Sequence, residues 1–298
     1  MGLSTSQSAR VPGQIGARSV TVALATILTC TLTQAFNRPI GFLPTCTRSR
    51  CIALRLKHQG DAKFSGWHLH ALDRLPDLVI LSGDLVEHGA PEEYAQAASR
   101  LKDLTLPFLI VAGNHDDRDC LRQAFPDHRY LPETGALNYC IDEHPVRILV
   151  LDTCRPGLHH GEVDEQDLAW LDRTLRLDPT KATLLVMHHP PFVSGIPYLD
   201  KYRLMRPEPV AEILRGFSNI EAILCGHVHR TMIKRWAGTV VVSCPSTTTE
   251  IALQWRPDAV PQTFLGPPAC MLHAWDPLEG LVSHLSHIDK GAGPFPFF

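Results

Sequence analysis

Four short apolar runs in this chain each end in side chains of the kinds that bind metal ions. Apolar runs bounded by Gly or by polar residues are typical of buried strands. In open α/β sheets, ligands bind outside the carboxyl ends of the strands. We therefore expect the four endings to converge at one sheet edge, although they lie far apart in the sequence. The endings are Gly83-Asp84, Gly113-Asn114-His115, His188-His189 and Gly226-His227-Val228-His229.

Strands alternate with helices along most of the chain, which predicts an α/β protein with a sheet flanked by helices. Apolar spacing, Pro residues and acidic first turns predict helices over 91–104, 119–125, 164–176 and 209–217. Strands are expected over 78–81, 107–112, 137–141, 146–151, 183–187, 220–224, 232–236, 239–243, 270–275 and 281–288. For residues 20–33, the sequence leaves open a short helix or a short strand.

The endings supply one carboxylate, one carboxamide and three or four imidazoles, a mixture that suits Zn, Mn or Fe. A carboxylate can bridge two cations, and two cations can clamp a phosphate and lower the pKa of a bridging water. His227 and His229 point to the same side if the chain is extended there, and could reach one metal each if it is a loop. Any single His at a strand end is more often an ordinary polar residue, but four such endings together favour a site.

These motifs, in this order and at these separations, resemble the calcineurin-like metallophosphoesterase superfamily. Gly-Asn-His-Asp-Asp-Arg (113–118) and Met-His-His-Pro-Pro (187–191) are most similar to the class III cyclic-nucleotide phosphodiesterase and glycerophosphodiesterase group. Cys244-Pro245-Ser246-Thr247, and Gly266-Pro267-Pro268 with Leu272-His273, resemble the C-terminal part of that group. The resemblance covers about 70–288 and implies an αββα sandwich of two mixed sheets flanked by helices.

The resemblance also implies two metal ions, divalent or mixed-valence, of Fe, Mn or Zn. Asp84 would bridge both ions. Asn114, His188 and His227 would hold the second ion, and His229 the first. His115 would be catalytic, contacting the phosphate and assisting the leaving oxygen, while Asn114, His115 and His229 would bind substrate. The implied reaction is hydrolysis of a phosphodiester, above all of a 3′,5′-cyclic nucleotide, by attack of a metal-bound hydroxide.

One expected motif is absent. The resembled family opens with a strand ending in Asp-x-His, which supplies two ligands of the first metal, and no Asp-x-His precedes Asp84. His68-Leu69-His70 is the nearest imitation, but it lacks the carboxylate. As written, the chain would lack the first strand of its sheet and be weakly active or inactive. A catalytically impaired homologue is therefore one alternative, and a phosphomonoesterase of the same superfamily is another.

Residues 1–60 contain seven Lys or Arg and no acid, with no clear periodicity. Out-of-frame translation is one explanation: the codons of Pro44-Thr45-Cys46-Thr47, read from their third base, can encode Asp-x-His. Those of Leu28-Thr29-Cys30-Thr31 allow the same, but the Pro44 window lies nearer the usual separation from Asp84. A genuine divergent N-terminus and a targeting segment remain open, including an export signal over 20–35. We expect an atypical segment over 1–65, a metallophosphoesterase domain over 66–290 and a flexible tail over 291–298.

The net charge of −3 gives no support for a nucleic-acid polymer as partner. The nine Cys include no Cys-x-x-Cys pair and several lie in apolar runs, which is typical of reduced thiols in a cytoplasmic protein. No stretch is long and apolar enough to predict a membrane span with confidence. The expected partner is a small phosphodiester or cyclic nucleotide, with no membrane partner, and a homodimer is left open.

Overall fold

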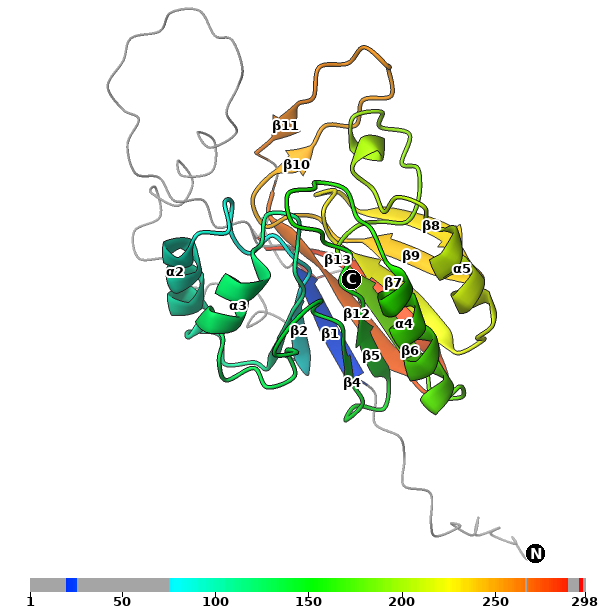
Figure 1. The fold of residues 1–298 in the computed structure, drawn as a ribbon. Coiled ribbons are helices and arrows are strands. Elements are labelled where there is room, and N and C mark those ends of the chain that lie inside the picture. Colours follow the sequence, from blue (N-terminus) through cyan, green and yellow to red (C-terminus); the bar gives the residue numbers. More distant parts are fainter. Residues whose placement is uncertain (1–19, 26–74, 266, 289–294, 297–298) are drawn as a thin grey trace, which may run out of the picture.

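Two mixed sheets form the centre of the molecule in this computed structural model, which describes residues 20–25, 75–265, 267–288 and 295–296 (Figure 1). The first sheet has five strands in the order β13-β12-β1-β2-β3. Its strands are β1 (Val20–Ala25), β2 (Leu78–Leu81), β3 (Phe108–Ile110), β12 (Ala269–Asp276) and β13 (Gly280–His287). β1 is parallel to β2 and antiparallel to β12, while β2 and β3 are parallel.

The second sheet has six strands in the order β4-β5-β6-β7-β9-β8. These are β4 (Tyr139–Ile141), β5 (Arg147–Val150), β6 (Thr183–Met187), β7 (Ile220–Cys225), β8 (Met232–Trp236) and β9 (Thr239–Ser243). β5, β6, β7 and β9 run parallel, and the edge strands β4 and β8 are antiparallel to their neighbours. Each sheet thus contains adjacent parallel strands, whose carboxyl ends lie together.

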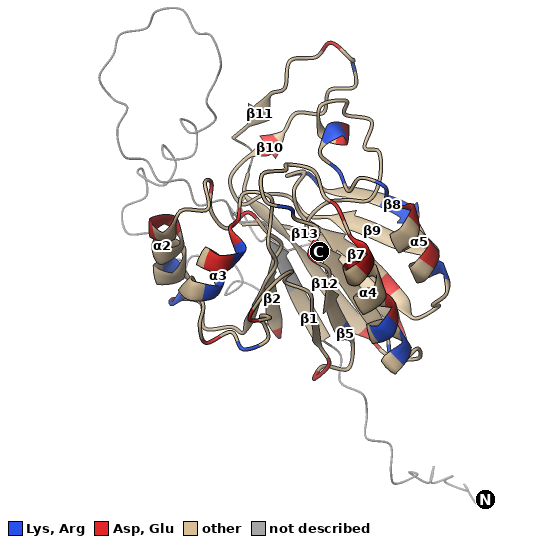
Figure 2. Cartoon of the chain, viewed as in Figure 1, with Lys and Arg blue, Asp and Glu red and all other residues tan. Residues whose placement is uncertain are grey.

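The helices cover the outer faces of the two sheets. They are α2 (Pro91–Leu101), α3 (Arg118–Ala124), α4 (Glu165–Leu177) and α5 (Glu208–Arg215), together with a short 3-10 helix, η4 (Leu199–Lys201). In Figure 1, α2 and α3 flank the five-stranded sheet, and α4 and α5 flank the six-stranded sheet. Figure 2 shows Lys, Arg, Asp and Glu positions along both α4 and α5; among those of α4, Asp167 is buried.

Alternation along the strands divides the apolar side chains between three cores. Leu78 and Ile80 of β2 pack with Ile148 and Val150 of β5 in the core between the sheets. The intervening Val79 and Leu81 instead join the core beneath α2 and α3, which contains Tyr94 and Leu121. A third core lies beneath α4 and α5 and contains Leu171, Leu175, Val210 and Leu214. The predicted αββα sandwich is therefore confirmed.

The expectation that the first strand would be missing is wrong. Val20–Ala25 forms β1, which lies in the middle of the five-stranded sheet between β2 and β12. Val20 and Val22 are buried in the core between the sheets. The predicted atypical segment 1–65 thus contributes at least this strand to the same sheet as the predicted domain over 66–290. The rest of that segment, including both codon windows, and His68 and His70 lie outside the described residues.

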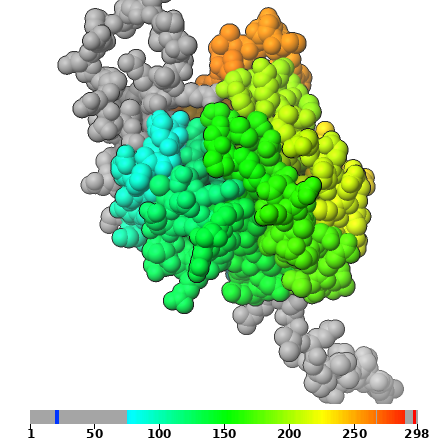
Figure 3. Space-filling model, in the orientation of Figure 1, coloured from blue at the N-terminus to red at the C-terminus, as the bar shows by residue number. Residues whose placement is uncertain are grey.

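The other predicted elements all occur, with ends that differ by a few residues. The sequence analysis missed η4 and a two-stranded ribbon formed by β10 (Glu250–Ile251) and β11 (Thr263–Phe264). The ribbon and its connecting loop project from the top of the molecule in the space-filling view (Figure 3). Among the described helices, none is long and apolar enough to cross a bilayer.

Candidate metal centre

The four polar endings come from both sheets, two from each. Asp84 follows β2 and Asn114 follows β3, so the five-stranded sheet supplies one pair. His188 follows β6 and His227 follows β7, so the six-stranded sheet supplies the other. The expectation of a single sheet edge is wrong in this respect. The carboxyl ends of the parallel strands in the two facing sheets meet, which places the candidate site at the junction between the sheets.

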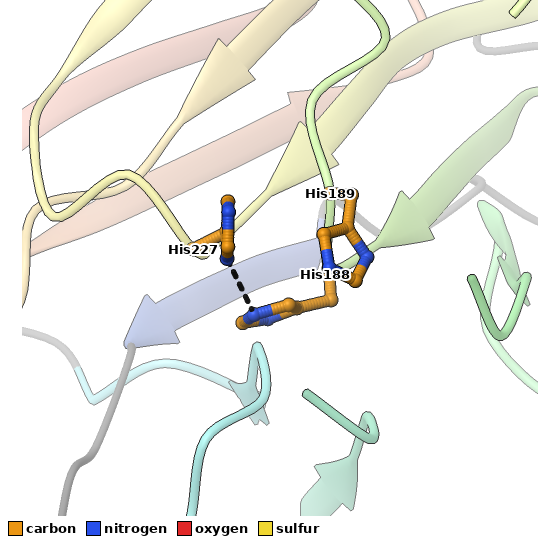
Figure 4. A group of neighbouring side chains, drawn as sticks. All are labelled: His188, His189 and His227. Carbon is orange, nitrogen blue, oxygen red and sulfur yellow. Dashed lines mark hydrogen bonds between the residues drawn. The ribbon is translucent and has the colours of Figure 1, made fainter. Parts of the chain in front are cut away.

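Four predicted ligand side chains, called the metal cluster below, come together: Nε2 of His188 faces the side chains of Asp84, Asn114 and His227. This atom lies 3.3 Å from Oδ2 of Asp84, 3.2 Å from Oδ1 of Asn114 and 3.2 Å from Nδ1 of His227. Figure 4 shows His188 and His227 pointing toward each other, with this contact dashed. The structure thus brings together the whole set predicted for the second metal.

The other ring nitrogen of His188 determines what the converging atoms are. Nδ1 lies 2.7 Å from the carbonyl oxygen of Ser82, which only accepts hydrogen bonds, so Nδ1 carries a proton. Nε2 is then the nitrogen with a lone pair in the neutral ring, and it faces oxygen and nitrogen acceptors. Such a backbone carbonyl contact is also how proteins orient metal-binding His residues. A metal cation fits this set of lone pairs.

His227 provides a second indication that the site is built for a cation. Its Nε2 atom is buried and has no hydrogen-bond partner among the described residues. Burial, together with the neighbouring His188, holds the pKa of His227 well below its usual value. The ring is therefore neutral near pH 7, the state in which imidazole binds metals. The backbone of His227 has a φ of 66°, an uncommon conformation of the kind that is often found at functional sites.

Asp84 is the buried negative charge of the cluster, with 3% of its surface exposed. Burial raises its pKa, but the nearby His188 more than offsets this effect, and the net pKa lies well below its usual range. Oδ1 accepts a hydrogen bond of 3.0 Å from the backbone N–H of His115. Asp84 is therefore ionised and held in place by the ending of the neighbouring strand.

His189 belongs to the geometric cluster but differs from His188 in its contacts. His188, His189 and His227 form the one group of at least three metal-ligand side chains found in the described part of the chain (Figure 4). Nε2 of His189 faces the carbonyl oxygen of His159 at 3.3 Å, and Nδ1 lies 2.7 Å from Oγ1 of Thr153. Nε2 must donate to that carbonyl, so Nδ1 accepts from the Thr153 hydroxyl, and both nitrogens are engaged. These contacts favour His188 over His189 as the ligand.

Two glycines allow the endings of β2 and β3 to approach this closely. A Cβ atom on Gly83 would overlap Nδ1 of His188 and would lie 2.9 Å from the backbone of Gly113. A Cβ atom on Gly113 would overlap Asp84. Gly83 also has a φ of +101°, which strongly favours glycine. The geometry of the site therefore requires Gly83 before Asp84 and Gly113 before Asn114.

His115 and His229 lie at the edges of this cluster. Nδ1 of His115 contacts the carbonyl oxygen of Glu87 at 2.8 Å, so Nδ1 carries the proton and Nε2 is the nitrogen left for other chemistry. Nδ1 of His229 lies 3.1 Å from Oγ1 of Thr249. Asp84 and His229, the two ligands predicted for the first metal, both lie within the described residues.

The sequence analysis missed three residues around the cluster. Thr153 holds His189, Thr249 contacts His229, and His159 lies with its Nδ1 3.4 Å from the Asn114 amide nitrogen. Thr153 carries the signal used for the other endings, because Asp152-Thr153 follows the buried strand β5. Thr249 and His159 lie in loops and follow no apolar run directly, so strand endings could not reveal them.

Comparisons with known proteins agree with this geometry. A model of the calcineurin-like phosphoesterase family matches residues 59–231. A protein of Arcobacter nitrofigilis named "Probable glycerophosphodiester phosphodiesterase GpdQ" is 36% identical over 232 residues, or 78% of this chain and 85% of the relative. The 3′,5′-cyclic adenosine monophosphate phosphodiesterase CpdA of Escherichia coli K12 is 32% identical over 174 residues, or 58% of this chain and 62% of the relative.

A solved structure shares the fold. The dimetal phosphatase from Danio rerio superimposes with a TM-score of 0.53 and 16% sequence identity, covering 91% of this chain and 99% of the phosphatase. At this identity the likeness concerns the arrangement of the two sheets and their helices.

Proposed function

The chain belongs to the calcineurin-like phosphoesterase family, and we propose that it hydrolyses small phosphodiesters, 3′,5′-cyclic nucleotides above all, at the junction between its two sheets. The observation that supports this most strongly is the convergence of Asp84, Asn114 and His227 on Nε2 of His188. Relatives named as phosphodiesterases of glycerophosphodiesters and of cyclic AMP point to the same reaction class.

Each residue of the cluster has a proposed part in this reaction. Asp84, Asn114, His188 and His227 would hold one cation, and Asp84 and His229 would contribute to a second. Bound there, two cations of Fe, Mn or Zn would neutralise the phosphate and lower the pKa of an attacking water. The Asn114 amide, which already reaches toward His159, would also contact a phosphate oxygen.

His115 is the proposed catalytic residue. Its backbone N–H is fixed to Asp84 and its Nδ1 is fixed to Glu87, so the ring is oriented from both sides. Nε2, the remaining nitrogen, can deliver a proton to the leaving oxygen when the ring carries a proton on both nitrogens. This orientation is what proton transfer requires, because a general acid must lie within hydrogen-bond reach of the atom that it protonates.

We also propose that turnover is low in the chain as written. Catalytic sites for first-row metals commonly have three or more protein ligands, and only Asp84 and His229 are assigned to the first metal. A single cation can orient a phosphate but cannot polarise a water from two sides.

The test is a panel of three substrates with purified protein in excess Mn²⁺: cyclic AMP, bis-p-nitrophenyl phosphate and p-nitrophenyl phosphate. We expect slow hydrolysis of the two diesters, faster than that of the monoester, with fewer than two bound metals per chain by mass spectrometry. In Asp84→Asn, both metal content and hydrolysis should fall, because a carboxamide bridges two cations poorly. Preference for the monoester would contradict the proposed substrate class, and full metal content in Asp84→Asn would contradict the bridging role.

A further inference from the structure

A row of four aromatic rings extends from the candidate catalytic residue, His115. The ring centroids of His115 and His159 are 6.0 Å apart, and those of His159 and Tyr202 are 6.1 Å apart. Tyr198 continues the row, 5.3 Å from Tyr202. His159 is exposed, while Tyr198 and Tyr202 are half-buried. None of these four residues is among the proposed metal ligands.

The loop that carries His159 is held in place by its backbone. The N–H of Gly161 donates to the carbonyl oxygen of Arg203 at 3.1 Å, and the N–H of Met205 donates to the carbonyl oxygen of Gly161 at 2.8 Å. Gly161 also lies so close to His189 that a Cβ atom there would be 2.7 Å from the imidazole. The loop therefore packs against His189 and is hydrogen-bonded to the segment that carries Tyr202.

The hydrogen bond to Asn114 fixes which nitrogen of His159 accepts. The Asn114 amide donates to Nδ1 of His159 at 3.4 Å, because Oδ1 of Asn114 faces His188. The ring of His159 is thus hydrogen-bonded to a proposed phosphate contact, and its centroid lies 6.0 Å from that of the proposed catalytic His115. Charge favours an anionic ligand here, since the segment 198–206 contains Lys201, Arg203 and Arg206 but only one acid.

We propose that His159 and Tyr202 are specificity-determining residues that contact a planar, heteroaromatic part of the substrate, such as a nucleobase. Because the two rings lie at 87° to each other, one would stack on the face of the base and the other would meet its edge. This inference rests on the proposed phosphodiesterase function and adds to it the side chains that distinguish a nucleotide from a glycerophosphodiester. Base–aromatic stacking is strong enough for this purpose and tolerates any base, because every base has a π-face. A flexible glycerol ester offers these rings no comparable surface.

The experiment compares two ligands that share a ribose and a phosphate and differ only in the base. Calorimetric titration of the Mn²⁺-treated protein with adenosine 5′-monophosphate and with ribose 5-phosphate gives the ratio of their dissociation constants. We expect adenosine 5′-monophosphate to bind roughly tenfold more tightly. In His159→Leu and Tyr202→Leu the ratio should fall toward one. Tyr202→Phe should keep the wild-type ratio, because the aromatic ring remains.

His160→Leu is the matched control, because His160 is the next residue in the same loop but its Nε2 faces Glu162 at 3.3 Å instead of Asn114. It should keep the wild-type ratio. Equal affinities for the two ligands, no binding of adenosine 5′-monophosphate, or an unchanged ratio in Tyr202→Leu would each overturn the inference. The titration needs no turnover, so absence of hydrolysis with a preserved preference for the base would count against the proposed function alone.

Discussion

Gly83 joins two requirements in one residue, a left-handed backbone and contact with a metal-binding imidazole. Its φ of +101° strains any other residue, and an added Cβ would meet His188. Gly135 has a similar backbone, with a φ of +73°, but an added Cβ there would meet nothing within 4 Å. Comparing substitutions at the two glycines therefore distinguishes the effect of backbone strain from the effect of crowding the site.

We predict that Gly83→Ala weakens Mn²⁺ binding by at least about tenfold, because moving an orienting contact of a ligand typically costs 10- to 100-fold in affinity. Gly135→Ala should lose some stability but bind Mn²⁺ as the wild type does. Titration with Mn²⁺ and urea unfolding of both variants provide the measurement. Equal Mn²⁺ affinities in the two variants would show that the close approach at Gly83 has no role in the site.

In an active form of the protein, with the Asp-x-His motif restored, His115→Ala should reduce turnover by about 10²- to 10⁴-fold while leaving metal content unchanged, because the side chain is assigned to proton transfer and not to metal binding. The backbone N–H that holds Asp84 remains in this variant. Steady-state kinetics and metal analysis by mass spectrometry check this, with the exposed His287→Ala as control. Loss of metal with unchanged turnover per bound ion would refute the assignment.

At the residue scale, the sequence identifies the side chains at strand endings and misses those that approach from loops. Asp84, Asn114, His188 and His227 stand next to apolar runs, so their convergence follows from the geometry of parallel strands. His159 stands beside another His in a polar loop. Only the folded structure distinguishes these two histidines, since one faces Asn114 and the other Glu162.

At the scale of elements, helix α2 supports the two loops that carry Asp84 and Asn114. Asp116 joins these loops by accepting hydrogen bonds from the backbone N–H groups of Gly113 and Leu85. The hydroxyl of Tyr94 on α2 donates to Asp116 at 3.0 Å and accepts from the N–H of Asp117 at 2.8 Å. The helix thereby positions the ligands without touching the metal cluster.

Tyr94→Phe should therefore lower the free energy of unfolding by about 1–3 kcal/mol and weaken Mn²⁺ binding roughly tenfold. Tyr130→Phe is a matched control. Its hydroxyl also bonds to backbone, at Ile110 and Phe108 of β3, but away from the metal cluster. It should lose stability and keep the Mn²⁺ affinity. If both variants retain that affinity, α2 has no positioning role.

Strand β1 changes which codon window could hold the missing motif. Ala25, the last residue of β1, pairs with Leu81, and Asp84 follows Leu81 by three residues. Leu28 follows Ala25 by the same number of residues, whereas Pro44 is much farther along the chain. The strand register therefore favours the Leu28 window over the Pro44 window.

We predict that the coding DNA, read in the shifted frame across residues 28–31, encodes Asp-x-His. A protein with that frame restored should bind two metals per chain and hydrolyse bis-p-nitrophenyl phosphate faster than the chain as written. Sequencing of the gene and metal analysis of both proteins test this. Equal metal content and equal activity in the two proteins would refute it.

The boundaries of β6, β8 and β9 were predictable because polar or turn residues delimit each of them. β1 was ambiguous, because a short apolar run with Thr residues has no periodicity that separates a buried strand from a short helix. β10 and β11 have two residues each and are not buried, so no hydrophobic pattern marks them. Pairing with β2 and β12 determines β1, whereas β10 and β11 are strands only because they pair with each other.

At the scale of the whole molecule, the predicted layers are correct, but the assignment of strands to the sheets could not be read from the residues. β1 pairs with β12 at the opposite end of the sequence, as in the register pair Val22 and His273. No local signal indicates this pairing. It also places His273 in a fully buried position.

His273 should make the stability of the whole fold depend on pH. Burial, and to a smaller extent the charge of His284, lowers the pKa of His273 to about 4 from the usual 6.5. The unfolded chain therefore binds more protons than the native protein between these values, so stability is lost as the pH falls from about 6.5 toward 4. The expected loss from this residue between pH 7 and pH 5 is roughly 2 kcal/mol.

Urea unfolding at pH 5 and pH 7, in a chelator that removes metals, measures this effect. His273→Gln cannot be protonated in this range, so it should show a pH dependence smaller by that amount. His284→Gln leaves the buried ring in place and should retain most of the dependence. An identical pH dependence in the wild type and in His273→Gln would exclude this role for His273.

The strands of the first sheet come from opposite ends of the sequence, which affects when that sheet can form during synthesis. All six strands of the second sheet lie within residues 139–243, so that sheet can assemble from one continuous stretch of nascent polypeptide. The first sheet cannot, because β1 is completed only by β12, which the ribosome makes more than 240 residues later. Long-range pairing of this kind is slow and leaves strand edges exposed meanwhile. β1 and its buried valines Val20 and Val22 therefore remain without their β12 partner until nearly all of the chain has been made.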